Sequence, residues 1–307
     1  MAPILVCSTV ASLAGWYGPA TTVSEHNGRP VISVDGKSHV PHWFVGSVGL
    51  GRSCAKGGSN LSALYVQVGA AAAAGFELVE VCLAQWQLNA SYPGGIEPQT
   101  QHVINTVLHA SLHAKLVLRI LVEHVTEPIT LQSWRNGSRL NVTGSPGDKL
   151  SQGVSTIAGA WAAGAAAGLV PFVTALDAAY PKRVAGVHLT AMHSGEWNWP
   201  GMCTWDTGGN DYAADYSEPT RVDFCLDSHD LSDDSTQESC TLPTASERNK
   251  PRTGNSFVCG PSPSKEASLV VEANRLLSRL TARAIAALAD ALKNASAQRL
   301  LVLAFHG

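Results

Sequence analysis

Short apolar runs recur along the chain and alternate with longer segments whose apolar residues have helical spacing. We predict a strand from each of five runs, at 42–48, 77–83, 116–122, 184–192 and 300–306. The segments between them predict helices over 61–74, 102–112 and about 150–176, and a long amphipathic helix from residue 268. Such alternation of strands and helices is typical of an α/β protein with a parallel sheet.

Other parts of the chain predict turns and loops. Residues 29–40 alternate in polarity around Asp35-Gly36, a pair that favours a β-hairpin. Residues 126–152 are polar and predict an exposed loop, and 227–264 are so rich in Ser, Asp, Pro, Thr and Asn that we expect a partly disordered insertion. We therefore expect one domain over 29–307, preceded by an N-terminal segment, 1–28, that could contain a leader.

The segment from residue 150 to 176 is uncharged and long enough to span a membrane. It is mostly Ala and Gly, contains Pro171, and lies between two predicted strands. We therefore interpret it as an Ala-rich helix of the domain, kinked or split near Pro171, and expect no membrane partner.

Composition limits the classes of partner. The 307 residues are 45% hydrophobic and 15% charged, with a net charge of −3, so the chain can bury a large core but has no basic surface for nucleic acid. Neutral ligands fit this balance better. The sequence does not predict the oligomeric state.

The cysteines and glycosylation sequons favour a secretory route. Seven cysteines include no C-x-x-C pair, which argues against a zinc ribbon or a thioredoxin-like site. We expect Cys82 to be a buried thiol, while four cysteines in polar sequence could form disulfides in a secreted protein: Cys203, Cys225, Cys240 and Cys259. Five Asn-x-Ser/Thr sequons exceed the roughly two that chance predicts. The expected location is secreted or in the endomembrane lumen, and the alternative is the cytoplasm.

The strand predicted at 184–192 leads into the strongest candidate for catalysis. Glu196 follows it, flanked by Gly195 and Trp197 and close to Trp199. In (β/α) barrels the residues at the carboxyl ends of strands line the substrate pocket, and indole rings can stack on sugars. We predict that Glu196 is catalytic and that Trp197 and Trp199 bind substrate; the alternative is an exposed loop acid.

This region resembles a known family. Gly195-Glu196-Trp197 after a strand, followed by Asp211-Tyr-Ala-Ala-Asp-Tyr-Ser217 and Phe224, is similar to the fourth-strand region of β-galactosidase-like glycoside hydrolases, the retaining (β/α)8 enzymes of clan A. The resemblance implies a TIM barrel, with about five of its eight β/α units in this chain, and Glu196 as the general acid/base. The family usually has Asn before this acid, where this chain has Gly195.

Further residues near predicted strand ends are candidates for binding a carbohydrate. Arg119 matches a basic residue that points to the pocket in the family, and the alternative role is a structural ion pair. Either role requires a partner, because an unpaired buried guanidinium is costly. Trp86 could be a sugar platform or a packed loop aromatic. His193 and His306 complete the set. We expect no cofactor and no metal, because no second His-rich segment adds to the His193–Glu196 spacing.

Retaining hydrolysis also needs a carboxylate nucleophile about 5 Å from the acid. In the family it lies near the end of the seventh strand, so we expect it beyond Gly307; Glu123 is the best internal candidate. The predicted function is β-galactosidase-like hydrolysis of an O-glycosidic bond, and we expect the 307-residue chain alone to be inactive. The alternative is a carbohydrate-binding protein of the same fold without catalysis.

Overall fold

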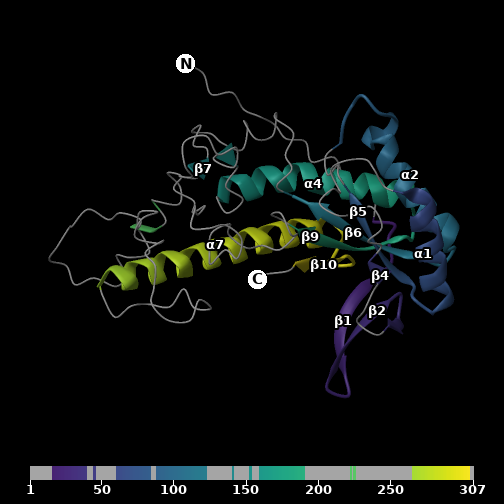
Figure 1. The fold of residues 1–307 in the computed structure, drawn as a ribbon, viewed down its shortest axis with the longest axis horizontal. Helices are drawn as coiled ribbons and strands as arrows, with labels where there is room; N and C mark the ends of the chain where they lie inside the picture. The colour runs from purple at the N-terminus through teal and green to yellow at the C-terminus, as the bar shows by residue number, and fades with distance from the viewer. Residues whose placement is uncertain are drawn as a thin grey trace.

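The computed structural model describes residues 16–39, 44–45, 60–83, 88–122, 140–141, 152–153, 159–190, 222, 224–225 and 265–304. Its centre is a parallel sheet flanked by helices, beside a small antiparallel sheet (Figure 1). The parallel strands are β4 (Phe44–Val45), β5 (Leu78–Leu83), β6 (Lys115–Leu121), β9 (Val184–Thr190) and β10 (Leu301–Ala304). The helices are α1 (Leu61–Ala73), α2 (Pro98–Ala110), α4 (Gly159–Ala179) and α7 (Lys265–Ala295).

The five parallel strands follow chain order across the sheet, as β10-β9-β6-β5-β4. Each neighbouring pair is parallel. Parallel neighbours need a crossover connection, and the helices between the strands provide it. The prediction that these apolar runs form adjacent parallel strands is confirmed.

The prediction of a (β/α)8 TIM barrel, complete or in part, is wrong. Among the described residues the parallel sheet is open, with β4 and β10 as its two edges, and a separate antiparallel sheet accompanies it. Closing a barrel requires hydrogen bonds between the first and last strands and a consistent tilt and stagger of all of them. Alternating strands and helices occur in open sheets as well, so the pattern of apolar residues could not distinguish the two.

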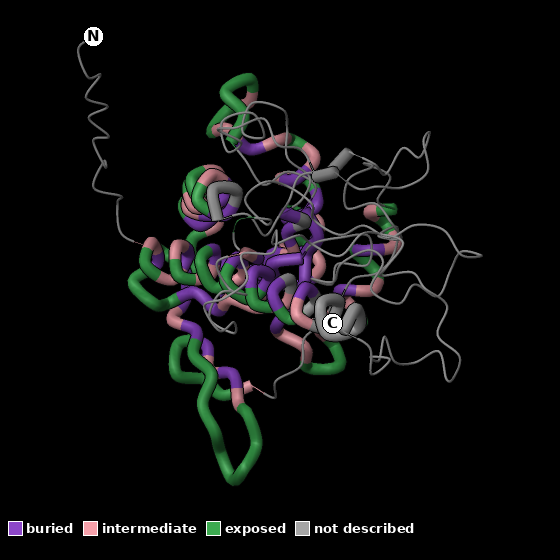
Figure 2. Tube along the Cα trace, turned by 90° about the vertical axis from the view of Figure 1, so that its left-hand side faces the viewer, coloured by how far each residue is buried: buried purple, intermediate pink, exposed green. Residues whose placement is uncertain are grey.

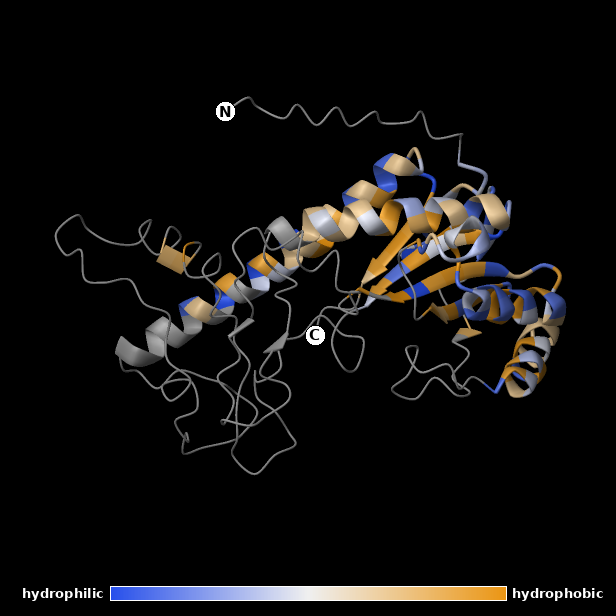
Figure 3. Cartoon of the chain, turned by 90° about the horizontal axis from the view of Figure 1, so that it is seen from above, coloured by the Kyte–Doolittle hydropathy of each residue, from blue (hydrophilic) through white to orange (hydrophobic). Residues whose placement is uncertain are grey.

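The four described helices pack on one face of the parallel sheet and form a single core with it. Figure 2 shows the buried residues gathered in the interior of the described part of the chain. Strand residues in this core include Val79, Val81, Leu83, Leu116, Leu118, Ile120, Val187 and Leu189, and helix residues include Val68, Ile104, Val107, Leu169, Phe172, Leu176 and Leu288. α4 and α7 run side by side and extend together past the sheet (Figures 1 and 3). We call this helix-covered side the first face of the sheet.

The helix ends agree with local sequence signals. The Asn60 side chain accepts a hydrogen bond from the Ala63 amide at 3.1 Å and caps α1, which ends before Gly75 at φ 90°.

α4 is one helix from Gly159 to Ala179 with Pro171 inside it, so the predicted split is not observed. Residues 162–179 of α4 are long and apolar enough to cross a membrane, a test that a core helix also passes.

The antiparallel sheet consists of β1 (Thr21–His26), β2 (Arg29–Val34) and β3 (Lys37–His39) in that order. Asp35 and Gly36 join β2 to β3 with φ angles of 51° and 80°, the positive values of a type I′ turn, which confirms the predicted hairpin. Ile32 and Val34 pack on three residues at the beginning of the parallel strands, namely Leu78, Ala185 and Leu301. The antiparallel sheet therefore covers the amino-terminal end of the second face of the parallel sheet.

The segment before β1 is held closely against the parallel sheet. The Tyr17 amide donates to Asp177 Oδ2 at 2.6 Å, and burial raises the pKa of the Asp177 carboxyl while this hydrogen bond opposes the rise. A Cβ atom on Gly18 would lie 2.7 Å from the Val184 carbonyl oxygen and 2.8 Å from Asp177 Oδ1. Only glycine fits between these atoms without a shift of the backbone.

Gly18→Ala is therefore expected to lower the free energy of unfolding by about 1–3 kcal/mol, the usual effect of overpacking. Urea denaturation followed by circular dichroism measures it. Gly69→Ala in α1 is the matched control, because its Cβ would meet only the Ala110 carbonyl oxygen at 4.0 Å, and alanine favours the helix. Equal stability of Gly18→Ala and the wild type would refute the close packing at this position.

Candidate functional site

A buried carboxylate lies in the middle of the parallel sheet. Glu80 of β5 is 4% exposed, and its neighbours Val79 and Val81 belong to the core on the first face. Successive side chains of a strand point to opposite faces, so Glu80 lies on the second face together with Leu78. A charged group inside an apolar strand requires partners that offset its desolvation.

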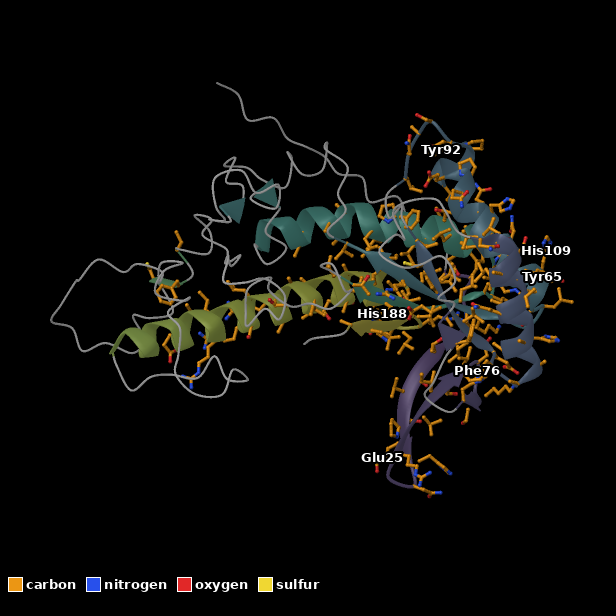
Figure 4. All side chains as sticks on the ribbon, viewed as in Figure 1. Glu25, Tyr65, Phe76, Tyr92, His109 and His188 are labelled. Carbon is orange, nitrogen blue, oxygen red and sulfur yellow. The ribbon has the colours of Figure 1, made fainter. Side chains whose placement is uncertain are left out.

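His188 of β9 is the first partner of this carboxylate. Its Nδ1 lies 2.9 Å from Glu80 Oε2, and both side chains are buried. A carboxylate oxygen accepts, so Nδ1 donates the hydrogen bond. β6 lies between β5 and β9, so the two side chains meet across an intervening strand. Figure 4 shows His188 in the central part of the sheet.

Arg119 of β6 is the second partner. Its Nη1 lies 3.7 Å from Glu80 Oε1, an ion pair rather than a well-formed hydrogen bond. Its side chain is 27% exposed, whereas those of Glu80 and His188 are 3% exposed, so Arg119 is the most exposed member of the network. The partner that burial of Arg119 required is thus Glu80. We call these three residues the Glu80–Arg119–His188 network.

Arg119 and His188 lie towards the carboxyl ends of β6 and β9, whereas Glu80 lies in the middle of β5. Arg119 and His188 are paired in the ladder between β6 and β9, and Glu80 is on β5, on the other side of β6. The last pair in the ladder, Leu121 and Thr190, ends both strands, and the Thr190 hydroxyl donates to the Ile120 carbonyl oxygen at 3.0 Å. Because parallel strands end at the same edge, segments that follow β5, β6 and β9 all leave beside the network.

Most of the predicted site residues lie outside the described residues. These are Trp86, Glu123, His193, Glu196, Trp197, Trp199 and His306. In sequence, Trp86 follows β5, Glu123 follows β6, His193 to Trp199 follow β9, and His306 follows β10. Of the predicted set, Arg119 is described, and the structure brings it together with two residues that the sequence had not singled out.

Glu80 and His188 are the residues that our sequence analysis missed. Both stand alone as ionisable groups in apolar runs, Leu-Val-Glu-Val-Cys-Leu and Val-His-Leu-Thr. The argument that a buried guanidinium needs a partner applies equally to a carboxylate in a strand with two buried faces. That signal would have indicated Glu80 and His188 as possible partners of Arg119.

The second face also has a cysteine beside the network. Cys82 of β5 is aligned with Arg119 in the ladder and is 7% exposed. Cys82 and Cys225 are both disulfide-bonded. The prediction that Cys82 is buried is confirmed, but the prediction that it is a thiol is wrong, because an apolar strand context does not reveal whether another cysteine lies beside it. Among described residues there is no cluster of three or more potential metal ligands.

Glu77 is a second carboxylate beside the sheet, and its contact joins two parts of the structure. Glu77, directly before β5, forms an ion pair with Lys37 of β3, and this hydrogen bond lowers the pKa of the Glu77 carboxyl. The contact joins the antiparallel sheet to the amino-terminal end of the parallel one. It lies at the edge opposite to the network, so it does not extend the candidate site.

No family model and no curated protein matches this chain. The resemblance to β-galactosidase-like hydrolases therefore remains a prediction from the residues around Glu196.

Proposed function

We propose that this protein binds a carbohydrate and hydrolyses an O-glycosidic bond, with Glu196 as the general acid/base. The observation that supports the proposal is the Glu80–Arg119–His188 network, near the strand ends from which the chain continues to Glu196 and Trp86. Three ionisable side chains in apolar strands cost desolvation energy, and such groups are concentrated at functional sites. The chain leaves β5, β6 and β9 at the carboxyl edge of the sheet, and this edge is where ligands bind in α/β sheets.

The chemistry of the residues favours a sugar as the ligand. Trp86, Trp197 and Trp199 offer apolar ring faces to the C–H side of a pyranose, and Arg119 matches a basic residue that points to the pocket in the family that the chain resembles. His193 and His306 add groups that donate or accept. The weak net charge of −3 agrees with a neutral substrate rather than a polyanion.

One observation favours binding without hydrolysis as the second candidate. Retaining hydrolysis needs two carboxylates about 5 Å apart, one of them as nucleophile. Glu80 is a carboxylate on the second face, but its two oxygens face His188 and Arg119, which suits a structural rather than a nucleophilic role. A protein that retained the aromatic and arginine contacts without a nucleophile would bind sugars only.

We also propose a secreted or lumenal location, with the cytoplasm as the alternative. Disulfides at Cys82 and Cys225 form and persist in oxidising compartments. Three of the five sequon asparagines, Asn60, Asn89 and Asn294, are exposed and could accept a glycan.

The test uses the full-length protein with a panel of nitrophenyl β-glycosides and with the corresponding free disaccharides. We expect hydrolysis of at least one β-glycoside, with the β-anomer as the first product in a proton NMR time course. Binding by calorimetry without release of nitrophenol would favour the binding protein. Neither hydrolysis nor binding of any sugar in the panel would refute both candidates.

A further inference from the structure

We propose that Asn89 carries an N-linked oligosaccharide, and that it accepts this glycan on the folded protein where two other sequons do not. Three sequons lie wholly within the described residues, and they begin at Asn60, Asn89 and Asn294. All three asparagines are exposed, so exposure of the asparagine alone does not distinguish them. The inference rests on the proposed secreted or lumenal location and deepens it, because it assigns the modified residue.

The sequon at Asn89 is exposed at all three of its positions. Asn89, Ala90 and Ser91 lie in the loop that leads from β5 to α2. Figure 4 shows Tyr92, the next residue, in this loop and away from the parallel sheet. Within the part of the chain that the structure describes, no hydrogen bond involves Asn89 Nδ2 or the Ser91 hydroxyl. A glycan on Nδ2 would therefore displace no contact of the folded chain.

Hydrogen bonds hold this loop in a turn. Asn89 Oδ1 accepts from the Ser91 amide at 2.9 Å, which is an Asx-turn. The Tyr92 amide donates to the Asn89 carbonyl oxygen at 3.0 Å, and the Asn89 amide donates to the Gly95 carbonyl oxygen at 2.9 Å. These bonds use the carboxamide oxygen and the backbone of Asn89, and they leave its carboxamide nitrogen for the sugar.

The sequon at Asn294 has a buried hydroxyl. It spans the end of α7, where Ser296 is 0% exposed. The Ser296 hydroxyl donates to the Lys293 carbonyl oxygen and accepts from the Leu300 amide, both at 3.2 Å. A transferase that recognises the sequon must reach this hydroxyl. It would have to open the end of α7 and break both hydrogen bonds, which leaves buried polar groups without partners.

The sequon at Asn60 is part of a helix start. Asn60 Oδ1 caps α1 by accepting from the Ala63 amide at 3.1 Å, and the next two residues already belong to the helix. Leu61, the middle residue of the sequon, packs against the core on the first face. Binding of this sequon by a transferase would therefore remove the cap and unwind the first turn. The turn at Asn89 lies outside any helix and outside the core, so it opens at a lower cost.

The donor for this reaction is an oligosaccharide on a polyisoprenyl diphosphate. A base of the transferase takes one proton from Asn89 Nδ2, and an N–C bond forms at the anomeric carbon of the first sugar. The bond from that carbon to the diphosphate oxygen breaks, and the lipid diphosphate leaves with its electron pair. No group is oxidised or reduced. The product has a bulky hydrophilic group on the loop between β5 and α2.

The first test measures acceptance by the folded protein. The full-length protein is produced without glycans in an oxidising bacterial periplasm, and its fold is checked by circular dichroism. It is then incubated with a purified oligosaccharyltransferase and the lipid-linked donor. Peptide mass spectrometry reads each sequon separately. We expect the glycan on Asn89 and on neither Asn60 nor Asn294.

Two variants and a control assign the signal. Asn89→Gln should lose the glycan because it removes the acceptor nitrogen from the sequon. Ser91→Ala should lose it as well, although it keeps Asn89 and the backbone amide of the Asx-turn, so it serves if Asn89→Gln fails to fold. Asn294→Gln is the matched control and should keep the glycan on Asn89.

The second test examines the protein made by a eukaryotic cell with its natural amino terminus. Peptide N-glycosidase in water labelled with heavy oxygen converts each glycosylated asparagine to a labelled aspartate, and we expect the label at Asn89. An exported protein without label at Asn89, or a folded acceptor modified at Asn294 and not at Asn89, would overturn the inference while the location stands. A protein retained in the cytoplasm would overturn the proposed location and the native glycan with it.

Discussion

In a form of the protein that hydrolyses a β-glycoside, Glu196→Gln is expected to lower kcat for a β-linked disaccharide by about a hundred- to ten-thousand-fold, the contribution typical of a general acid or base. Glutamine keeps the size and polarity of the side chain but cannot donate a proton to the glycosidic oxygen. With a nitrophenyl glycoside the same substitution should slow cleavage of the glycosidic bond less, because the nitrophenolate leaving group needs little protonation. Comparing single-turnover rates of the two substrates for wild type and variant measures this difference.

Glu25→Gln provides the control for this experiment. Glu25 lies on β1, is exposed, and belongs to the antiparallel sheet at the other end of the parallel strands (Figure 4). The control should retain wild-type kinetics with both substrates. A Glu196→Gln variant that retained them too would show that another residue is the acid.

Phe172→Ala is expected to lower the free energy of unfolding by about 3–5 kcal/mol. Phe172 is 0% exposed and is among the largest fully buried side chains in the core on the first face. Truncation removes the whole buried ring and leaves a cavity that the packed strands and helices can fill only in part. Guanidinium denaturation, with the midpoint and the slope fitted together, measures the change.

Pro171→Ala is the neighbouring control. Pro171 is inside α4 and exposed, so its replacement removes no buried surface and restores an N–H donor within the helix. We expect this variant to be at least as stable as the wild type. If Pro171→Ala lowered the free energy of unfolding as much as Phe172→Ala, α4 would not pack on the sheet through the face that contains Phe172.

The elements that the sequence predicted best are those with a purely local cause. The runs at 77–83, 116–122 and 184–192 became β5, β6 and β9, because a strand buried on both faces consists almost entirely of apolar residues. The turn at Asp35-Gly36 was predictable because Gly tolerates positive φ and Asp adopts it more readily than most residues. The disulfide at Cys82 was not predictable, since it depends on a contact that the strand sequence does not contain.

The candidate site was predictable only in part. That Arg119 needs a partner follows from its place in an apolar strand, whereas the identity of this partner depends on which strand lies beside β6. Glu80 and His188 are far apart in the sequence. They meet because β5, β6 and β9 pair in chain order, with the ionisable residue of each strand on the same face of the sheet.

By itself the sequence determined the five parallel strands, the main helices, the hairpin and the presence of an ionisable residue within the sheet. Each of these depends on apolar periodicity, turn conformation or desolvation, which act over a few neighbouring residues. Only the tertiary structure decided that the described sheet is open and that all four helices share one face. It alone joined Glu80, Arg119 and His188, because hydrogen bonds between strands and contacts between side chains across them link residues that no local pattern connects.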